Sequence, residues 1–436
     1  MTDAWFDNGV VRLYQSDARS LPIPDNSVDC VVTSPPYWGL RDYGIDEQGI
    51  GLEPTPEEYC ANMVEVFREV WRVLKPTGTL WLNLGDVYAH SGASGGASPD
   101  GPRKPRATDR EAQLKIGGTM GAGRKPKDLV GIPWRVAFAL QADGWYLRSD
   151  IIWSKPNPMP ESVTDRPTKA HEYVFLLTKS PKYYYDADAI REKWADDRHG
   201  MDGSVQPSER NRGGRTDGFT KPNGIDPSRN GGRNKRTIWE ITTAPFSDQI
   251  CQRCRTHYTS QSFSRLRNGN DPMCDTQLEN GEMCNGIRFF EDDGYWVCAA
   301  CDTGYMPKQL KRLPKTRRCR VCKREDGWIS HFATFPIQLP ILCIKAGTSE
   351  WGVCPTCGAP WERTLERTDD RHRTAGWQPT CKHNTSPVPA TVLDPFAGAC
   401  TTMLAARKLN RASVGIDLNN SYLDMGIART LQGSLL

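Results

Sequence analysis

Apolar and polar positions alternate in a regular way near both ends of the chain. Short apolar runs predict β-strands at 10–15, 27–33, 79–84, 146–153, 172–178, 390–394 and 412–417. Apolar residues at helical spacing predict α-helices at 56–74, 131–142, 336–346, 400–409 and 420–431, and Pro76, Thr77 and Gly78 are expected to end the first of them. Strands alternating with helices predict an α/β fold in which both ends of the chain build one parallel or mixed sheet.

The middle of the chain lacks this periodicity. Segments 89–127 and 192–236 are rich in glycine and polar residues, which predicts long loops. Segment 101–127 carries eight Lys or Arg residues against two acids, and 198–236 carries nine against four. With a third basic run at 308–324, these segments favour contact with nucleic-acid phosphates over merely solvated loops.

Bulk composition limits the class of protein. With 436 residues, the chain can bury a substantial core and hold more than one structural unit. No apolar run approaches the ~20 residues of a membrane helix, and the first residues lack the basic and apolar regions of a secretory signal. We therefore expect a cytoplasmic protein of bacterial, archaeal or phage origin with no membrane partner.

Fifteen cysteines, several in Cys-x-x-Cys pairs, indicate metal sites in such a protein. One set fits a zinc ribbon, with 17 residues between its two pairs: Cys298, Cys301, Cys319 and Cys322. A looser set could exchange pairs with the first: Cys251, Cys254, Cys274 and Cys284. A third set has His372 as a rival fourth ligand: Cys354, Cys357, Cys381 and His383. The sequence therefore predicts two or three structural zinc ions.

A proline-rich loop, Thr-Ser-Pro-Pro-Tyr-Trp, follows the second predicted strand. This loop resembles the catalytic loop of the DNA methyltransferases that modify the amino group of a base. Such an amino group is a poor nucleophile, because its lone pair is delocalised into the ring. Hydrogen bonds to the Ser34 side chain and the Pro35 carbonyl would localise that lone pair, and Pro35 and Pro36 would fix the loop. Tyr37, extended by Trp38, would offer a face on which a base taken out of the duplex can stack.

A second loop motif lies near the other end, where residues 392–402 read Val-Leu-Asp-Pro-Phe-Ala-Gly-Ala-Cys-Thr-Thr. The two motifs resemble the catalytic and S-adenosylmethionine loops of the DNA methyltransferases that modify adenine N6 or cytosine N4. The resemblance implies a Rossmann-like methyltransferase sheet with helices on both faces. It also implies cofactor-binding roles for Asp17, Thr334, Asp394, Phe396, Gly398 and Asp417. Asp417 by itself would equally fit a helix cap. Cys400 departs from the family pattern, which has a glycine there, so we expect an altered turn or a looser cofactor contact.

The order of the motifs, catalytic first and cofactor last, resembles the circularly permuted β class of these enzymes. The segments 71–78, 150–157 and 171–173 also fit that class. The resemblance implies a site-specific methyltransferase acting on double-stranded DNA, with a homodimer and a separately encoded restriction nuclease as associated expectations. Ser34 slightly favours cytosine N4 over adenine N6, because many adenine enzymes of the family have Asp there.

Other functions remain as alternatives to a DNA methyltransferase. One, from another class, is a zinc-dependent nucleic-acid-binding protein whose methyltransferase domain is inactive. Methylation of RNA or protein is disfavoured by the permuted order of the motifs.

These patterns divide the chain into functional parts. We expect a catalytic half at 1–190, with a flexible basic loop at 89–127. A polar linker at 191–246 is expected to help to recognise the target, and a zinc-binding insertion follows at 247–330. The cofactor-binding half is expected in two pieces, 331–350 and 385–436, with a small zinc knuckle between them at 351–384. The cysteine insertions and segment 186–236 are predicted to help recognise the DNA site, with a purely structural role as the rival interpretation.

Overall fold

The computed structural model describes most of the predicted sheet and its helices. The described residues are 3–40, 49–89, 125–192, 233–243, 249–251, 257–258, 289–292, 295–298, 303–305, 328–329, 335–368 and 371–432. Between 249 and 329 the description covers only the backbone of short strands.

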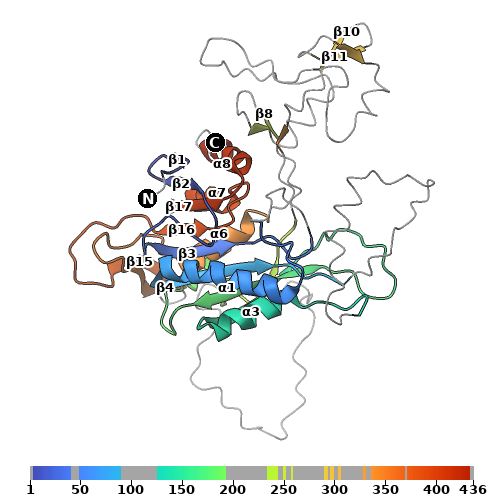
Figure 1. The fold of residues 1–436 in the computed structure, drawn as a ribbon. Helices are drawn as coiled ribbons and strands as arrows, with labels where there is room; N and C mark the ends of the chain where they lie inside the picture. Colours follow the sequence, from blue (N-terminus) through green and yellow to red (C-terminus); the bar gives the residue numbers. More distant parts are fainter. Residues whose placement is uncertain are drawn as a thin grey trace, which may run out of the picture.

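Nine strands of the described residues form one sheet, in the order β1-β2-β17-β16-β3-β4-β6-β5-β7 (Figure 1). Their bounds are β1 (Phe6–Asp7), β2 (Val11–Gln15), β3 (Val28–Thr33), β4 (Leu74–Leu84), β5 (Tyr146–Ser154), β6 (His171–Thr178), β7 (Ile238–Glu240), β16 (Thr391–Asp394) and β17 (Ala412–Asp417). Every residue of β3 is buried, as its apolar run predicts.

Strands from opposite ends of the chain build the centre of this sheet. β16 pairs in parallel with β3, β17 pairs in parallel with β2, and β16 and β17 are parallel neighbours. On the other side of β3, β4 is parallel and β6 is antiparallel. The predicted mixed sheet, assembled from both ends of the chain, is confirmed.

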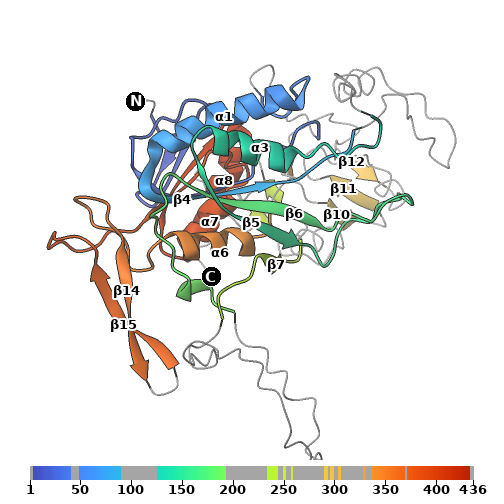
Figure 2. The same cartoon turned by 90° about the horizontal axis from the view of Figure 1, so that it is seen from below.

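Helices cover both faces of the sheet (Figure 2). The helices are α1 (Pro56–Val73), α3 (Ile132–Ala142), α6 (Gln338–Gly347), α7 (Thr401–Lys408) and α8 (Asn420–Gln432), with a short 3-10 turn, η2 (Asp188–Ile190). Val31 and Leu393 pack in the cluster of α1 and α3, whereas their neighbours Val32 and Val392 pack in the cluster of α6 and α7. Successive strand residues point to opposite faces, so the apolar strands contribute to both cores.

The sequence of α1 explains its start and its orientation. Thr55 accepts a hydrogen bond from the Glu58 amide at 3.2 Å, and Pro56 occupies the first turn, where its missing N–H costs nothing. The buried face of the helix has the predicted spacing: Tyr59, Met63, Val66, Phe67, Val70 and Val73.

One predicted boundary is wrong. The segment 76–78 does not form a turn between α1 and the next strand, because β4 begins at Leu74, directly after α1. Val28 pairs with Leu74 but Cys30 pairs with Thr79, so residues 75–78 bulge out of the ladder. A bulge tolerates Pro76, which has no N–H to donate to a neighbouring strand.

The chain forms a hairpin of β14 (Trp361–Thr368) and β15 (Arg371–Pro379), which the sequence does not predict. The hairpin follows α6 and precedes β16 in the sequence, and it projects away from the central sheet (Figure 2). Two small antiparallel sheets lie within the predicted zinc-binding insertion: β8 (Gln249–Cys251), β9 (His257–Tyr258) and β13 (Trp328–Ile329) form one, and β10 (Phe289–Asp292), β11 (Tyr295–Cys298) and β12 (Thr303–Tyr305) form the other. Among the described residues, no helix has the length and apolar character to cross a bilayer.

Candidate functional site

The two loop motifs meet at one edge of the sheet. Ser34 follows β3 and Phe396 follows β16, and these strands are parallel neighbours, with Leu393 paired to Val31 (Figure 1). After β16 the chain enters α7 on one face of the sheet, whereas after β3 it enters α1 on the other face. The carboxyl ends of these strands therefore form a topological switch point, the position at which open α/β sheets bind ligands.

Asp394 joins the two motifs. One of its oxygens accepts a hydrogen bond from Thr33 Oγ1 at 2.7 Å and from the Phe396 amide at 3.1 Å, and the other accepts from Thr402 Oγ1 at 2.7 Å. The residue is 2% exposed, and burial raises its pKa to about 6. Asp394 thus holds the loop after β16 against the end of β3.

Asp417 lies at the end of β17, beside the same loop. Its two oxygens accept hydrogen bonds from the Gly398 and Asn419 amides, each at 2.8 Å, and burial raises its pKa to about 6. The side chain that caps α8 is Asn419, which accepts from the Ser421 amide at 3.0 Å. The structure therefore disagrees with the alternative of Asp417 as a helix cap.

Cys400 adopts a backbone conformation that favours glycine. Its φ of 57° lies in the left-handed region, and the side chain is buried. A Cβ on Gly426 would lie 2.1 Å from the Cys400 sulfur, so the absence of a side chain at Gly426 makes room for the thiol. α8 thus supplies the space that the larger residue needs, and an altered turn or a looser cofactor contact at Cys400 stays a prediction.

Asp17 lies two residues beyond β2, at the same edge of the sheet. It forms an ion pair with Arg19 at 2.7 Å and accepts a hydrogen bond from the Arg19 amide at 2.8 Å. Burial acts to raise the pKa of Asp17, but the hydrogen bonds and charge of Arg19 bring it below its ordinary value. The residue is thus a partly exposed carboxylate just beyond β2, the strand that pairs with β17 of Asp417.

The loop after β3, residues 34–38, is held by contacts with α1 and with the end of β4. Tyr59 Oη donates to the Pro36 carbonyl at 2.9 Å. A Cβ on Gly85 would lie 2.5 Å from the Tyr37 ring, so this glycine allows the ring to lie over the end of β4. The expectation that Trp38 extends a stacking face is wrong: it is 1% exposed, and its indole N–H donates to the Glu53 carbonyl at 2.8 Å.

A polar network beside Ser34 was missed by sequence reasoning. Ser34 Oγ lies 3.3 Å from Tyr37 Oη, which donates to Glu172 at 2.7 Å. Asn83 also donates to Glu172, at 3.1 Å, and Lys155 pairs with it on the other oxygen. The signal was present, since two of these residues lie in segments 150–157 and 171–173 that resemble the family, but no role was assigned to them.

Several predicted residues lie outside the described part of the chain. Among the cofactor residues this applies to Thr334, and among the metal ligands to Cys254, Cys274, Cys284, Cys301, Cys319 and Cys322. Cys251 lies in β8 and Cys298 in β11, where only the backbone is described. Most of the predicted basic loop and polar linker is also outside it, at 90–124 and 193–232.

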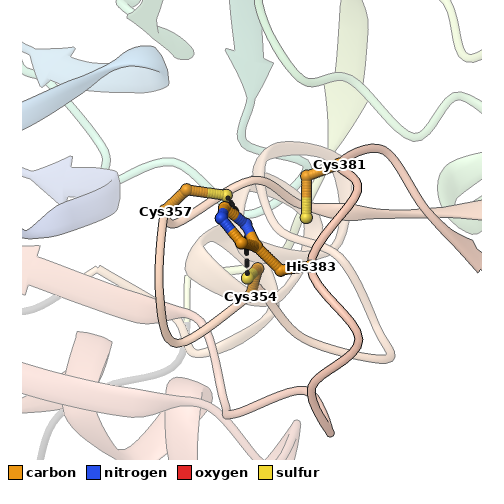
Figure 3. A group of neighbouring side chains, drawn as sticks. All are labelled: Cys354, Cys357, Cys381 and His383. Atoms are coloured by element: carbon orange, nitrogen blue, oxygen red, sulfur yellow. Dashed lines mark hydrogen bonds between the residues drawn. The ribbon is translucent and has the colours of Figure 1, made fainter.

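The third cysteine set comes together as a compact cluster (Figure 3). The ligand atoms of Cys354, Cys357, Cys381 and His383 all lie within 4.8 Å of one another. His383 Nδ1 lies 3.3 Å from the Cys357 sulfur and 3.7 Å from the Cys354 sulfur. The rival ligand, His372, lies in β15 with an undescribed side chain. Three thiols and an imidazole at this separation match the donor set of a closed tetrahedral zinc site.

This cluster lies at the amino-terminal edge of the sheet, opposite Ser34. A Cβ on Gly358 would lie 3.0 Å from the Lys75 side chain, and Lys75 pairs with Asp29 of β3 at 2.7 Å. Arg363 of β14 pairs with Asp186 at 3.0 Å. The insertion at 351–384 is thus attached where the strands of the central sheet begin.

Comparison with known proteins shows the family of this chain. The model of the DNA methylase family matches residues 28–428. The type II methyltransferase M.Cfr9I of Citrobacter freundii is 48% identical over 69% of this chain and 87% of its own length. M.SmaI of Serratia marcescens is 47% identical over 93% of this chain and 84% of its own. A solved structure described as PvuII DNA methyltransferase (cytosine-N4-specific) covers 97% of this chain and 86% of its own, with a TM-score of 0.45 and 13% identity.

The family match spans both motifs and the strands that bring them together. The chain belongs to the DNA methylase family, the S-adenosylmethionine-dependent methyltransferases that modify exocyclic amino groups of DNA bases.

Proposed function

We propose that this chain transfers a methyl group from S-adenosylmethionine to the exocyclic amino group of a base extruded from double-stranded DNA, with cytosine N4 favoured over adenine N6. The observation that carries the proposal is the hydrogen bond between Thr33 and Asp394, which holds the loops of Ser34 and Phe396 together at one edge of the sheet. Bound there, the cofactor would supply an electrophilic methyl carbon next to the base.

The cofactor would lie across the ends of β2, β17 and β16. In this proposal Asp417 accepts hydrogen bonds from the ribose hydroxyls, since it follows the strand beside the cofactor loop. Phe396 and Gly398 line the loop, and Asp17 approaches the adenine. Asp394 acts through the loop, because its oxygens already accept hydrogen bonds from Thr33, Thr402 and Phe396. Thr334, which lies outside the described residues, is proposed to face the methionine end.

The base would lie at the ends of β3 and β4. Ser34 Oγ and the Pro35 carbonyl accept hydrogen bonds from the amino group and aim its lone pair at the methyl carbon. Pro36 is held by Tyr59, which keeps the loop rigid. Tyr37 provides the face on which the extruded base stacks.

Methylation of DNA by the purified protein tests this proposal. Unmodified genomic DNA would be incubated with protein and S-adenosylmethionine and then sequenced with chemistry that distinguishes N4-methylcytosine from N6-methyladenine. We expect N4-methylcytosine at one short recurring sequence. N6-methyladenine would overturn the choice of base, and unmodified DNA from a protein that binds S-adenosylmethionine in calorimetry would favour an inactive DNA-binding protein.

We also propose that one structural zinc ion binds to Cys354, Cys357, Cys381 and His383. Four ligands close the coordination sphere and leave no position for substrate, so the ion would stabilise a segment too short to form its own core. Its attachment to the amino-terminal edge of the sheet favours the structural role over DNA recognition for this insertion. Metal analysis of wild type and a Cys381→Ser variant should differ by one zinc per chain.

The remaining expectations concern partners. Segment 191–246 and the cysteines of 247–330, which would hold one or two further zinc ions, are proposed to recognise the DNA sequence. A homodimer and a separately encoded restriction nuclease are proposed on the family resemblance. Replacing 247–330 by a short linker should abolish site preference in a protein that still folds, and sedimentation would give the oligomeric state.

A further inference from the structure

Glu172 is a carboxylate that the proposed mechanism does not use, although it lies two hydrogen bonds from Ser34. It stands at the start of β6, beside the ends of β4 and β5, with its side chain only 14% exposed. One oxygen pairs with Lys155, which also lies 4.5 Å from the centre of the Trp153 ring. The other oxygen accepts from Tyr37 and from Asn83. Glu172 is thus held in place from three strands or their loops.

The direction of the hydrogen bonds follows from this arrangement. Tyr37 Oη has one proton and two acceptors within reach, Glu172 at 2.7 Å and Asn83 Oδ1 at 3.3 Å. The shorter bond to a charged acceptor is the stronger. Burial, reinforced by the Glu172 charge, raises the pKa of Tyr37 well above its usual value, so the phenol keeps its proton and donates it.

With the Tyr37 proton directed at Glu172, the phenol oxygen can accept a hydrogen bond from Ser34 Oγ, 3.3 Å away. Ser34 then directs its own proton toward Tyr37 and turns its lone pairs outward, which is the orientation needed to accept from an amino group. Without Glu172, the serine hydroxyl would be equally able to rotate and offer its proton to the base.

We propose that Glu172, with Lys155 as its partner, is a positioning residue that orients Ser34 through Tyr37 and finally takes the proton that the methylated amino group loses. The inference rests on the proposed function. The amino nitrogen bonds to the methyl carbon as the carbon–sulfur bond breaks, and sulfur keeps that electron pair. The positively charged nitrogen gives a proton to Ser34, Ser34 gives its own to Tyr37, and Tyr37 gives its own to Glu172.

The charges around Glu172 suit this step. Lys155 contacts it directly, and Lys169 lies close enough for the two charges to interact, while Lys169 itself donates to the Asp86 carbonyl at 2.7 Å. Two ammonium groups therefore lie near this carboxylate. Because the side chain is partly exposed, the proton can then pass to solvent.

Single-turnover methyl transfer from labelled S-adenosylmethionine to unmodified genomic DNA tests the proposal. We expect Tyr37→Phe and Glu172→Gln each to slow transfer by roughly 100-fold, the usual scale for a lost acid–base group, with unchanged cofactor binding in calorimetry. Glu350→Gln is the matched control, since it removes the same charge from an acid that is 60% exposed and paired with Arg363 at the opposite edge; its rate should equal that of wild type.

A measurement without cofactor or DNA separates this role from a merely structural one. In protein labelled at the tyrosine ring carbon that bears the hydroxyl, the Tyr37 signal, assigned with Tyr37→Phe, should titrate at lower pH in Glu172→Gln than in wild type. If Glu172→Gln does not fold, Glu172→Gln combined with Lys155→Gln avoids the unpaired ammonium and serves the same purpose.

The outcomes distinguish this inference from the proposed function. Wild-type transfer rates in the Glu172 variants, with Ser34→Ala inactive, would overturn the inference and leave the proposed function intact. An unchanged Tyr37 titration would overturn it as well. Failure of the wild-type protein to methylate any DNA would overturn the proposed function itself.

Discussion

The two edges of the central sheet are built in different ways. At the carboxyl edge, polar side chains from four adjacent strand ends converge on a switch point and are held by amides and hydroxyls, as Asp394 and Asp417 are. At the amino edge, buried charged side chains connect segments that are far apart in the sequence: Lys75 contacts Asp29, which also accepts from the Thr391 amide at 2.8 Å. Arg411, 5% exposed, donates to Thr348 at 3.0 Å.

We infer from this difference that the carboxyl edge carries the reaction and that the amino edge stabilises the fold. The carboxyl edge leaves groups such as Ser34 half-buried on loops, where a substrate can reach them. The amino edge joins the catalytic half to the cofactor half through the hydrogen bond between Asp29 and Thr391, and the cysteine insertion contacts the catalytic half at Lys75 and Asp186. Substitutions at the first edge should therefore change the rate, and substitutions at the second should change the free energy of unfolding.

The largest expected effect is on the rate. Ser34→Ala removes the hydroxyl that accepts from the amino group and should slow methyl transfer by at least about 100-fold, with an unchanged melting temperature. Ser27→Ala is the matched control at the other end of β3, where the hydroxyl donates to the Pro24 carbonyl at 2.6 Å. Radiolabel transfer and thermal unfolding would be measured for both variants. Equal transfer rates in the two would contradict a catalytic role that is specific to the carboxyl edge.

The next effect is on stability at the amino edge. Cys357→Ser should lose the proposed zinc ion and lower the melting temperature by more than about 5 °C, while the rate at low temperature stays within about twofold of wild type. Cys60→Ser, a half-buried cysteine of α1 outside the cluster, controls for the substitution itself. Calorimetry with metal analysis checks this. A variant that is as stable as wild type would argue against a metal-stabilised insertion.

A smaller effect tests packing at the carboxyl edge. Gly426→Ala places a methyl group against the Cys400 sulfur and should cost roughly 1–3 kcal/mol in free energy of unfolding. In a Cys400→Gly background the same substitution should cost much less, because the thiol is gone. A double-mutant cycle in urea measures the coupling, and additive costs would contradict direct contact.

The last effect is a dependence of the free energy of unfolding on pH. The pKa of Asp394 rises on folding from 3.8 to about 6, so the folded state binds more protons between these values. The stability that Asp394 contributes is therefore greatest below about pH 4 and falls as the pH rises to about 6. Asp394→Asn cannot titrate. The unfolding free energy of wild type minus that of this variant should decline over pH 4–6, and a constant difference would refute the assignment.

Much of the fold could be predicted because its elements repeat simple patterns. The continuous apolar run of β3 and the helical spacing in α1 specify a buried strand and a helix. The meeting of Ser34 with Phe396 also followed from the sequence, since each motif comes directly after an apolar strand and parallel strands end at one edge.

The remainder depended on contacts that no local pattern encodes. Glu172 and Lys155 lie 17 residues apart and meet only because β5 and β6 pair in one register. The burial of Trp38 depends on a carbonyl in the following loop, at Glu53. The hairpin of β14 and β15 is rich in charged residues and lacks the alternation that marks a half-buried strand.

The bond between Thr33 and Asp394 spans 361 positions of the chain, and this has a consequence for biosynthesis. At ribosomal rates of 5–20 residues per second, about 20–70 s pass between the synthesis of β3 and the synthesis of β16. During that time one side of a buried and largely apolar strand has no neighbour. A nascent chain of this protein should therefore depend on chaperones, and it gains the capacity to modify DNA only after β16 has been synthesised.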